Sequence, residues 1–545
     1  MRIRGLFALG LLGGAACFTS VTLGANGPVD LVVAATTDTH GYVAGWNYLT
    51  GRPDTLRGLA RIATIVDSIR RASGTSPILV DAGDFLEGSM LTYAVARVDT
   101  TIKHPVIAAM NAMQYDAAAI GNHEFDYGIG TLDRAHHDAE FPFLSANIYG
   151  PNGQRRFLPW AVDIRRGIKV AIVGATTPGA AVWDHDQLDG RLQVRDIIPD
   201  VRSAVRDVRN AGAALVILVV HSGLNEPSVY DTVSTGVASE NVAARIAHEV
   251  SGIDVIVYGH THKEMADTVI AGTLLMQPKH WATSVAVAQV RLERHNGRWG
   301  VTYKRSRTIQ AVHHREDSQI LAVAEEGHRI AVRYAMTRIG TSPVAWRADS
   351  ARLTATPLTN FMLDAERQAS GAQLASTAVY APDGLEAGPI TVAEMMALYP
   401  YDNTLRAVRI SGTQLRAYIE HSARYFRANA GGIEPDPAVA SYNYDVVGGV
   451  DYQIDVSRPI GARLTRLEFQ GRPVADADTF TLALSNYRQS GGGAYAMFHS
   501  APVVYDKGKD IRELLIDDVK RRGTLRPEDF AGTHWRVVGG AEAKR

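Results

Sequence analysis

Five short apolar runs in the N-terminal half of the chain are each followed by a polar cluster that contains His, Asp or Asn. The runs are Leu31–Ala35, Pro77–Val80, Ala117–Ile120, Ala214–Val220 and Asp254–Val257. Longer segments with helical periodicity separate several of these runs, which predicts strand–helix units around a buried sheet. Because ligands bind beyond the carboxyl ends of strands in open α/β sheets, we expect the polar clusters to meet at one site.

The polar clusters consist of metal-binding and proton-transfer groups. They are Asp38-Thr39-His40, Gly83-Asp84, the hexapeptide Gly-Asn-His-Glu-Phe-Asp at 121–126, His221, and Gly-His-Thr-His at 259–262. Asp38 and His40 are two residues apart near a strand end, so an extended backbone would point both side chains the same way. Carboxylate oxygens combined with imidazole nitrogens suit Zn²⁺, Mn²⁺ or Fe²⁺ better than Mg²⁺ or Ca²⁺.

Individual residues in these clusters suggest different tasks. The carboxylate of Asp84 has two oxygens and could bridge two cations. Asn122 offers an amide oxygen, whereas His123 beside it is free to transfer a proton. A single Asp-x-His pair or a single histidine after an apolar run is common by chance. All five clusters in order, each after an apolar run, indicate a two-metal hydrolytic centre.

These motifs resemble those of the calcineurin-like metallophosphoesterases, which read D-x-H, G-D, G-N-H-[ED], H and G-H-x-H in succession. The resemblance covers residues 30–310 and implies two divalent ions per chain, with Mn, Zn, Fe and Co as the candidates. It implies one metal on Asp38, His40 and His262 and a second on Asn122, His221 and His260, with Asp84 bridging them. His123 matches the histidine that protonates or stabilises the phosphoryl group, and Asp126 matches the carboxylate that orients it.

The length of 545 residues favours more than one domain. An amphipathic stretch from Asp317 to about Arg338 predicts a connecting helix, capped by Asp317 or Ser318 and ended by Gly340. With the resemblance, the expected fold is mixed α/β: a metallophosphoesterase β-sandwich flanked by helices at 28–312, a linker helix at 313–340, and an α/β substrate domain at 341–540. The formal net charge of −1 provides no basic field, so we expect no polynucleotide binding.

Two tyrosine- and glycine-rich segments of the second half are candidates for substrate binding, at 442–445 and 486–495. Glycines let a backbone approach a ligand, and aromatic rings can stack on a base. Without the family, turn glycines and core tyrosines explain the segments equally well. They resemble the C-terminal domain of exported nucleotidases, which implies a base held between Tyr444 and Tyr495. Three further positions would line that site, namely Asn486, Gly491 and Gly492.

One segment of this chain differs from the usual 5′-nucleotidase motif and predicts the branch of the family to which the chain is most similar. The 5′-nucleotidases usually carry Asn-x-Gly-x-Ile-Arg where this chain has residues 376–383, and the phosphate-binding arginine is missing here. Residues 398–405, 420–426 and 485–493 resemble the 2′,3′-cyclic-nucleotide phosphodiesterase/3′-nucleotidase branch, so we expect 2′,3′-cyclic nucleotides and 3′-nucleotides as substrates. A 5′-nucleotidase or UDP-sugar hydrolase is the close alternative. An exported nucleotide- or metal-binding protein without turnover is the alternative of another class.

The N-terminus has the pattern of a secretory signal peptide at residues 1–25. Arg2 and Arg4 precede an apolar stretch that is too short to span a bilayer and ends in small residues. We therefore expect a periplasmic or secreted, monomeric protein without a transmembrane segment after cleavage. The single cysteine, Cys17, lies inside this segment, so the mature chain would have no disulfide. A lipid anchor at Cys17 is disfavoured because Gly14 occupies the place where such signals usually carry Leu.

Overall fold

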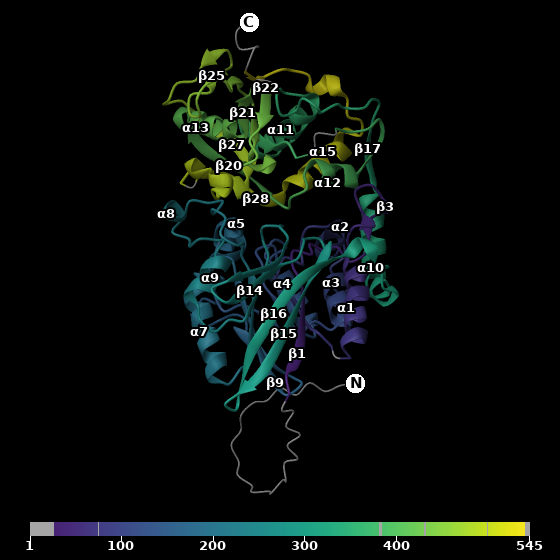
Figure 1. The fold of residues 1–545 in the computed structure, drawn as a ribbon. Coiled ribbons are helices and arrows are strands. Elements are labelled where there is room, and N and C mark those ends of the chain that lie inside the picture. The colour runs from purple at the N-terminus through teal and green to yellow at the C-terminus, as the bar shows by residue number, and fades with distance from the viewer. Residues whose placement is uncertain (1–26, 75, 381–383, 430–431, 499, 540–545) are drawn as a thin grey trace.

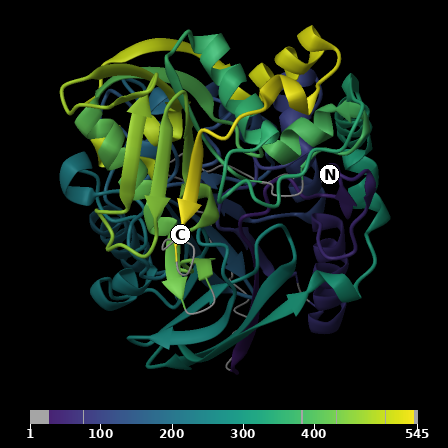
Figure 2. The ribbon, with the colours of Figure 1, turned by 90° about the horizontal axis from the view of Figure 1, so that it is seen from above.

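The structure is a computed structural model that describes residues 27–539 except 75, 381–383, 430–431 and 499. The predicted signal peptide and Cys17 lie outside the described residues. The C-terminal half of the chain lies on one end of the N-terminal half (Figure 1), and in the view from above it covers much of that end (Figure 2). Among the described residues no helix is long and apolar enough to cross a membrane.

The N-terminal half is built on two six-stranded sheets. The first has the order β16 (Arg298–Gln310), β15 (Ser284–His295), β1 (Val29–Thr36), β4 (Ile78–Asp81), β5 (Ala117–Ala119) and β6 (Phe143–Leu144). The second has the order β13 (Met265–Ile270), β14 (Thr273–Gln277), β12 (Val255–Tyr258), β11 (Leu215–His221), β9 (Ile168–Thr176) and β8 (Trp160–Arg165). Within each sheet the strands that precede the polar clusters run parallel to one another, so their carboxyl ends lie at one edge of each sheet.

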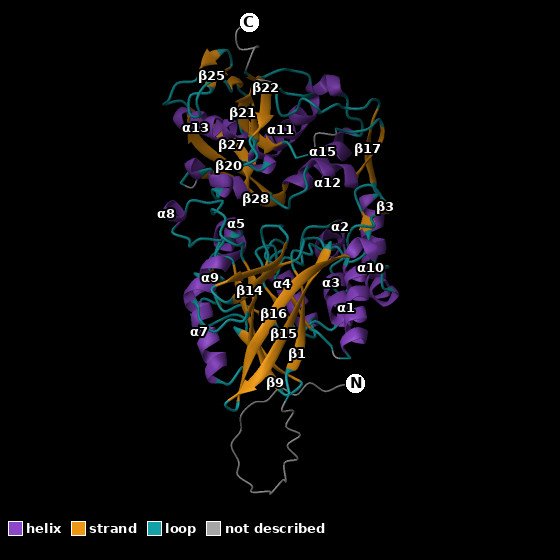
Figure 3. Ribbon diagram, viewed as in Figure 1, coloured by secondary structure: helices purple, strands orange, loops and turns teal. Residues whose placement is uncertain are grey.

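Helices cover the outer face of each sheet, as Figure 3 shows. On the side of the first sheet lie α1 (Leu59–Ser73), α3 (Pro105–Met113) and α4 (Ile129–Asp138), and on the side of the second lie α7 (Ile197–Asn210) and α9 (Ala243–Glu249). Alternate residues of β1 separate accordingly: Val33 and Ala35 face the second sheet, whereas Ala34 faces the helices. Burial on both faces explains why the five runs are continuously apolar. The predicted sandwich is confirmed.

The predicted connecting helix is α10 (Ser318–Ala335), and the Asp317 carboxylate caps it by accepting hydrogen bonds from the amides of Gln319 and Ile320. The helix packs on α3 and on the short helix α2 (Met90–Tyr93). Its predicted end is wrong. The helix ends at Ala335, and Gly340 lies within strand β17 (Arg338–Ser342), where it accommodates the Val519 side chain.

The C-terminal half contains a five-stranded sheet of order β23 (Asp445–Gly448), β18 (Leu374–Ala378), β27 (Thr479–Ser485), β20 (Thr404–Ser411) and β28 (Val503–Asp510). A four-stranded sheet has the order β26 (Arg472–Pro473), β25 (Leu464–Phe469), β24 (Asp451–Asp455) and β29 (Trp535–Val538). The main helices are α11 (Pro357–Ser370), α12 (Val392–Leu398), α13 (Gly412–Ser422) and α15 (Ile511–Arg522). β17 pairs with β19 (Gly388–Thr391) beside them.

The two halves contact each other directly through buried polar groups. The Tyr127 hydroxyl donates a 2.9 Å hydrogen bond to Asp402 Oδ2, and Asp402 forms a 2.7 Å ion pair with Arg512. The Ala494 amide donates a 3.0 Å hydrogen bond to the Val229 carbonyl. These contacts lie where the carboxyl-end loops of the sandwich face the second half, so the predicted site lies at the seam between the halves.

Candidate dimetal centre

The loops that follow the five strands are tied to one another by hydrogen bonds. The Asp38 amide donates to the Gly83 carbonyl and the His40 amide to the Asp84 carbonyl, each at 2.9 Å. The His260 amide donates to Asp38 Oδ1 at 3.0 Å. The first, second and last of the predicted ligand clusters are therefore held at fixed positions before any ion is bound.

Five predicted ligands have a left-handed backbone, with φ of 48° at Asp38, 46° at His40, 61° at Asp84, 76° at His260 and 55° at His262. The expected extended geometry of Asp38 and His40 is therefore wrong, because β1 ends at Thr36 and a tight turn follows. Such backbone costs about 1–3 kcal/mol per residue and concentrates at functional sites. The left-handed backbone recurs at five Asp and His residues that were predicted as metal ligands, which indicates a site under functional constraint.

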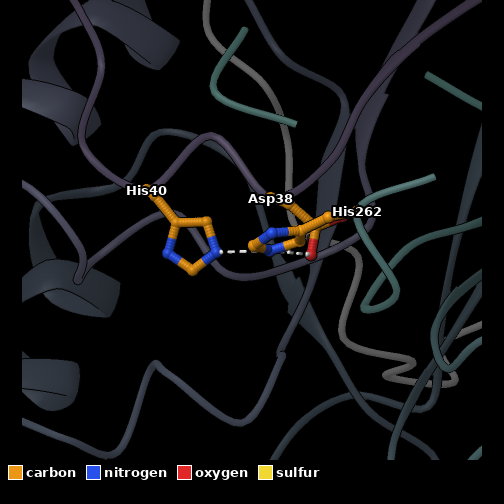
Figure 4. A group of neighbouring side chains, drawn as sticks. All are labelled: Asp38, His40 and His262. Carbon is orange, nitrogen blue, oxygen red and sulfur yellow. Dashed lines mark hydrogen bonds and ion pairs between the residues drawn. The ribbon is translucent and has the colours of Figure 1, made fainter. Parts of the chain in front are cut away.

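Asp38, His40 and His262 form the first group of converging side chains (Figure 4). His262 Nε2 lies 3.0 Å from His40 Nε2 and 3.6 Å from Asp38 Oδ1. His40 Nδ1 is 3.1 Å from the Glu87 carbonyl, which can only accept, so Nε2 is left with its lone pair. Burial and the neighbouring imidazoles lower the pKa of both histidines to about 3. Both rings are thus neutral, which is the form that binds a metal.

Asp84, His221 and His260 form the second group. His221 Nδ1 lies 2.8 Å from the Ala82 carbonyl, and His221 Nε2 lies 2.9 Å from Asp84 Oδ2. Burial lowers the pKa of His221, but the adjacent Asp84 carboxylate outweighs burial and raises it to about 9. A positive charge is therefore favoured beside Asp84, and a cation would supply it.

Asp84 and Asn122 fit the expected positions at the two groups. Asp84 Oδ2 is 4.0 Å from His40 Nε2 as well as 2.9 Å from His221 Nε2, so this carboxylate lies between the groups. Asn122 Oδ1 is buried and has no hydrogen-bond partner among the described residues. An unsatisfied buried acceptor costs about 1–3 kcal/mol unless a ligand engages it. The donor set therefore fits two divalent cations with mixed oxygen and nitrogen ligands.

His123 and Asp126 lie beside the two groups and contact each other. His123 Nδ1 is 2.8 Å from Asp126 Oδ2 and 3.3 Å from Glu87 Oε2. Burial lowers the pKa of His123, but the carboxylates of Asp126, Asp84 and Glu87 together raise it well above its usual value. The imidazole is therefore protonated near neutral pH, and Nε2 remains to donate a proton.

Sequence reasoning missed three buried carboxyl groups around the site. Glu124 accepts hydrogen bonds from the amides of Asp84, Phe85 and Gly121 and so fixes the backbone of two motifs. Glu87 lies against both His40 and His123. Glu240 Oε2 is 3.4 Å from His260 Nε2. Glu124 lies inside a motif and could have been found there. The other two follow no motif, and nothing in the sequence indicates that they are buried.

The glycines of the motifs are required by close backbone approach. A Cβ on Gly121 would lie 2.1 Å from Asp84 Oδ1, and one on Gly259 would lie 2.0 Å from Thr37 Oγ1 and 2.7 Å from Asp38 Oδ2. Both positions therefore exclude any side chain while the carboxylates keep their places.

The two tyrosines predicted to hold a base are in the core of the second half. Tyr444 is 1% exposed, donates a 2.9 Å hydrogen bond to the Arg352 carbonyl and stacks on Tyr425. Tyr495 is fully buried and donates a 2.8 Å hydrogen bond to the Asn443 carbonyl. Neither ring presents a free face, so the structure contradicts this assignment. Both rings are used for packing.

Other tyrosines are available at the seam. Tyr401 and Tyr442 are each 38% exposed, with ring centroids 6.2 Å apart. Burial raises the pKa of Tyr401 to about 12, and the charges of His123 and Glu87 act on it from the first half. Tyr487, on α14 (Asn486–Gln489), is half-buried. These rings, and not the two predicted ones, are at least partly exposed, and the charges of His123 and Glu240 act on their pKa values.

The remaining predicted substrate residues lie next to the aromatic surface that Tyr401, Tyr442 and Tyr487 form. Asn486 Oδ1 accepts a 3.0 Å hydrogen bond from the Thr404 amide. Gly491 has φ 96°, and a Cβ on Gly492 would lie 2.5 Å from the Tyr487 ring. Arg488 is buried, donates to the carbonyls of Gly492 and Tyr442, and forms an ion pair with Asp445. These residues hold the positions of Tyr442 and Tyr487.

Comparisons with known proteins agree with this arrangement. The chain is 26% identical over 94% of its length to the trifunctional nucleotide phosphoesterase protein YfkN of Bacillus subtilis, but it spans only 39% of that relative. It is 28% identical to the 2′,3′-cyclic-nucleotide 2′-phosphodiesterase/3′-nucleotidase of Salmonella typhimurium, over 94% of this chain and 89% of the relative. A solved Staphylococcus aureus structure named as a 5′-nucleotidase matches with TM-score 0.81 and 25% identity, over 94% of this chain and 100% of that one.

Two family models match separate parts of the chain and confirm the resemblance seen in its motifs. Residues 31–264 match the calcineurin-like phosphoesterases, and residues 338–500 match the C-terminal domain of 5′-nucleotidases. The first match ends just beyond His262, so it includes every predicted metal ligand and the pair His123 and Asp126. The chain thus joins a calcineurin-like phosphoesterase domain to a 5′-nucleotidase C-terminal domain and belongs to the metal-dependent phosphoester hydrolases.

Proposed function

We propose that the chain is an exported enzyme that hydrolyses 2′,3′-cyclic nucleotides to 3′-nucleotides and then to nucleoside and phosphate. The observation that carries the proposal is the exposed pair Tyr401 and Tyr442, whose loop is bound to the residue after Asp126 by the hydrogen bond from Tyr127 to Asp402. The similarity to the Salmonella relative over nearly the whole of both chains supports the same substrates. Export rests on the signal-peptide pattern of residues 1–25.

The metal ligands we propose are the two groups described above. One cation would bind Asp38, His40 and His262, and the other Asn122, His221 and His260, with Asp84 shared. When bound, two divalent cations would lower the pKa of a bound water and neutralise charge on the phosphoryl oxygens. The protein contributes rigid loops, and the backbone carbonyls at Nδ1 of His40 and His221 leave the Nε2 atoms of both rings to face the site.

His123 would protonate the leaving group. In the first step water attacks phosphorus and releases a proton to solvent, the bond from phosphorus to O2′ breaks, and His123 Nε2 gives its proton to O2′. His123 then takes up a proton from solvent. In the second step the bond to O3′ breaks in the same way, and nucleoside and phosphate leave. Asp126 holds the imidazole by Nδ1 and keeps it protonated before each step.

The second domain would select the substrate by its base. Stacking of a base on an exposed aromatic ring contributes about 1–3 kcal/mol, and Tyr442 offers such a ring beside half-buried Tyr487. Burial and the Glu240 carboxylate raise the pKa of Tyr442, which places this ring within electrostatic reach of the metal centre. A nucleotide could thus bind the aromatic surface with its base and the metals with its phosphate.

The test is to identify the products formed from 2′,3′-cyclic AMP over time. With Mn²⁺ present we expect 3′-AMP first, followed by adenosine and phosphate. Accumulation of 2′-AMP would contradict the proposed order of bond cleavage. A 5′-nucleotidase is the second candidate, favoured by the likeness to the Staphylococcus aureus structure, and it predicts that 5′-AMP is consumed faster than the cyclic substrate.

A further inference from the structure

Glu240 connects the metal centre with the seam between the domains. Its carboxyl group is fully buried, in the segment between β11 and α9. Oε2 lies 3.4 Å from His260 Nε2, whereas Oε1 accepts hydrogen bonds from the Val229 amide at 2.6 Å and from Asn241 Nδ2 at 3.1 Å. One carboxylate therefore contacts both a proposed metal ligand and the backbone of a loop at the seam.

The contact with His260 fixes how that ring can bind a cation. A carboxylate on Nε2 leaves Nδ1 as the free ring nitrogen and sets the tautomer. Trp183 stacks on the same ring, with centroids 5.3 Å apart. Since outer partners of this kind hold a ligand in place, loss of the Glu240 charge would weaken metal binding without removing a ligand.

Val229, the other partner of Glu240, is itself hydrogen-bonded to the second domain. The Val229 carbonyl accepts the 3.0 Å hydrogen bond of the Ala494 amide. Ala494 has φ 63° and follows Gly492, which packs against Tyr487, and Gly493, which packs against Arg488. The Val229 peptide is therefore held on one side by Glu240 and on the other by the loop that supports the aromatic surface.

We propose that Glu240 is a positioning residue that couples metal binding at His260 to the seating of the 491–494 loop on the first domain. Binding a cation at His260 strengthens its bond to the Glu240 carboxylate, and the ordered carboxylate holds Val229 in the place where it accepts from Ala494. Such coupling is reciprocal, so the seated second domain also strengthens metal binding. The inference rests on the metal centre of the proposed function but requires no particular nucleotide.

Hydrogen–deuterium exchange of the peptide containing Ala494 tests the coupling in the wild-type protein, with Mn²⁺ or with EDTA. We expect Mn²⁺ to slow exchange of the Ala494 amide by on the order of tenfold, because the interdomain hydrogen bond then opens less often. If the wild-type protein binds Mn²⁺ and hydrolyses nucleotide but the Ala494 amide exchanges at the same rate with Mn²⁺ and with EDTA, the coupling is refuted and the metal centre is not. Failure of the wild-type protein to bind Mn²⁺ would refute the metal centre itself.

Glu240→Gln removes the charge and keeps the shape of the side chain. We expect its Mn²⁺ affinity, measured by calorimetry, to fall roughly 10–100-fold. At saturating Mn²⁺ its Ala494 amide should exchange as fast as in the metal-free wild type. Asp231→Asn, on the same segment but at an exposed cap of α8 (Thr232–Thr235), is the matched control and should behave as wild type. Full Mn²⁺-dependent protection in Glu240→Gln would contradict the proposal. If Glu240→Gln does not fold, the exchange experiment on the wild-type protein tests the proposal by itself.

Discussion

The Tyr127 hydroxyl donates a 2.9 Å hydrogen bond to Asp402 Oδ2 across the seam between the domains. Tyr127 directly follows Asp126 of the dyad, and Asp402 directly follows the exposed Tyr401. Arg512 holds the same loop by pairing with Asp402 and donating to the carbonyls of Tyr399 and Pro400. This interdomain hydrogen bond therefore joins the residue beside the proton-transfer pair to the residue beside the proposed base-binding surface.

Tyr127→Phe removes the hydrogen bond to Asp402 and should weaken the contact between the two domains. A hydrogen bond to a charged group contributes about 1.5–3 kcal/mol, so the free energy of unfolding should fall by that amount. The radius of gyration from solution scattering should increase, and kcat/KM should fall. Tyr149→Phe is the control, because it removes a similar 2.6 Å bond to Asp200 within the first domain. It should lose stability without a change in domain separation, and equal scattering from both variants would refute the role of Tyr127.

His123→Asn should reduce turnover by about 10²–10⁴-fold, the usual contribution of a positioned acid. Metal content, measured on purified protein, should stay at the wild-type value, because His123 is not among the proposed ligands. Retained activity would show that another group protonates the leaving oxygen.

Asp126→Asn should change the pH profile. His123 donates only when it is protonated, that is, below its pKa, and Asp126 is the first of the charges that raise this pKa. Without that carboxylate the pKa falls, so the loss of activity on the alkaline side should move to lower pH. The exposed Asp133, which pairs with Arg156, provides the control Asp133→Asn with an unchanged profile. An alkaline limb that stays in place in Asp126→Asn would contradict the dyad.

Asn122→Ala should separate metal binding from folding. Because Asn122 Oδ1 has no hydrogen-bond partner among the described residues, its loss should leave the melting temperature in EDTA unchanged. The stabilisation by Mn²⁺ should decrease, since an ion that binds only the folded state stabilises it according to its affinity. Asn147→Ala is the control: its amide bonds the carbonyls of Thr176 and Arg195, so it should lower both melting temperatures. A lower melting temperature of Asn122→Ala in EDTA would show a structural role.

Tyr442→Ala and Tyr444→Phe test the corrected substrate surface. Loss of about 1–3 kcal/mol of base stacking should raise KM by about 5–150-fold in Tyr442→Ala with little change in kcat. Tyr444→Phe loses only its bond to the Arg352 carbonyl, which should cost about 0.5–1.5 kcal/mol of stability and leave KM unchanged. An unchanged KM in Tyr442→Ala would contradict Tyr442 as the stacking residue.

The sequence predicted the strands and the polar clusters because both follow from local pattern. A continuously apolar run is a strand buried on both faces, and parallel strands bring the residues that follow them to one edge of a sheet. The backbone at Asp38 and His40 could not be predicted, because the contacts that stabilise a left-handed turn there come from other loops. Glu240 was missed for the same reason, since its partners His260 and Val229 come together only in the folded chain.

The substrate tyrosines show where local pattern is insufficient. Tyr442 and Tyr444 are two residues apart beside the same short 3₁₀ turn, Ser441–Asn443, and look equivalent in the sequence. The ring of Tyr444 packs on Tyr425, in the 3₁₀ turn Ala423–Tyr425 that follows α13, and on Phe426, at the start of β21 (Phe426–Asn429), whereas Tyr442 stays at the seam. Which ring is buried depends on these distant aromatic residues, and no spacing rule determines it.

The most direct test of the account is the ratio of kcat/KM for 2′,3′-cyclic AMP, 3′-AMP and 5′-AMP, measured on the Mn²⁺-loaded protein under one set of conditions. We predict that the cyclic substrate and 3′-AMP are both hydrolysed faster than 5′-AMP, and that His123→Asn slows all three reactions by about 10²–10⁴-fold. A higher kcat/KM for 5′-AMP would contradict the proposed substrate while leaving the metal centre intact. No hydrolysis of any of the three by protein that retains its metals would contradict the proposed function itself.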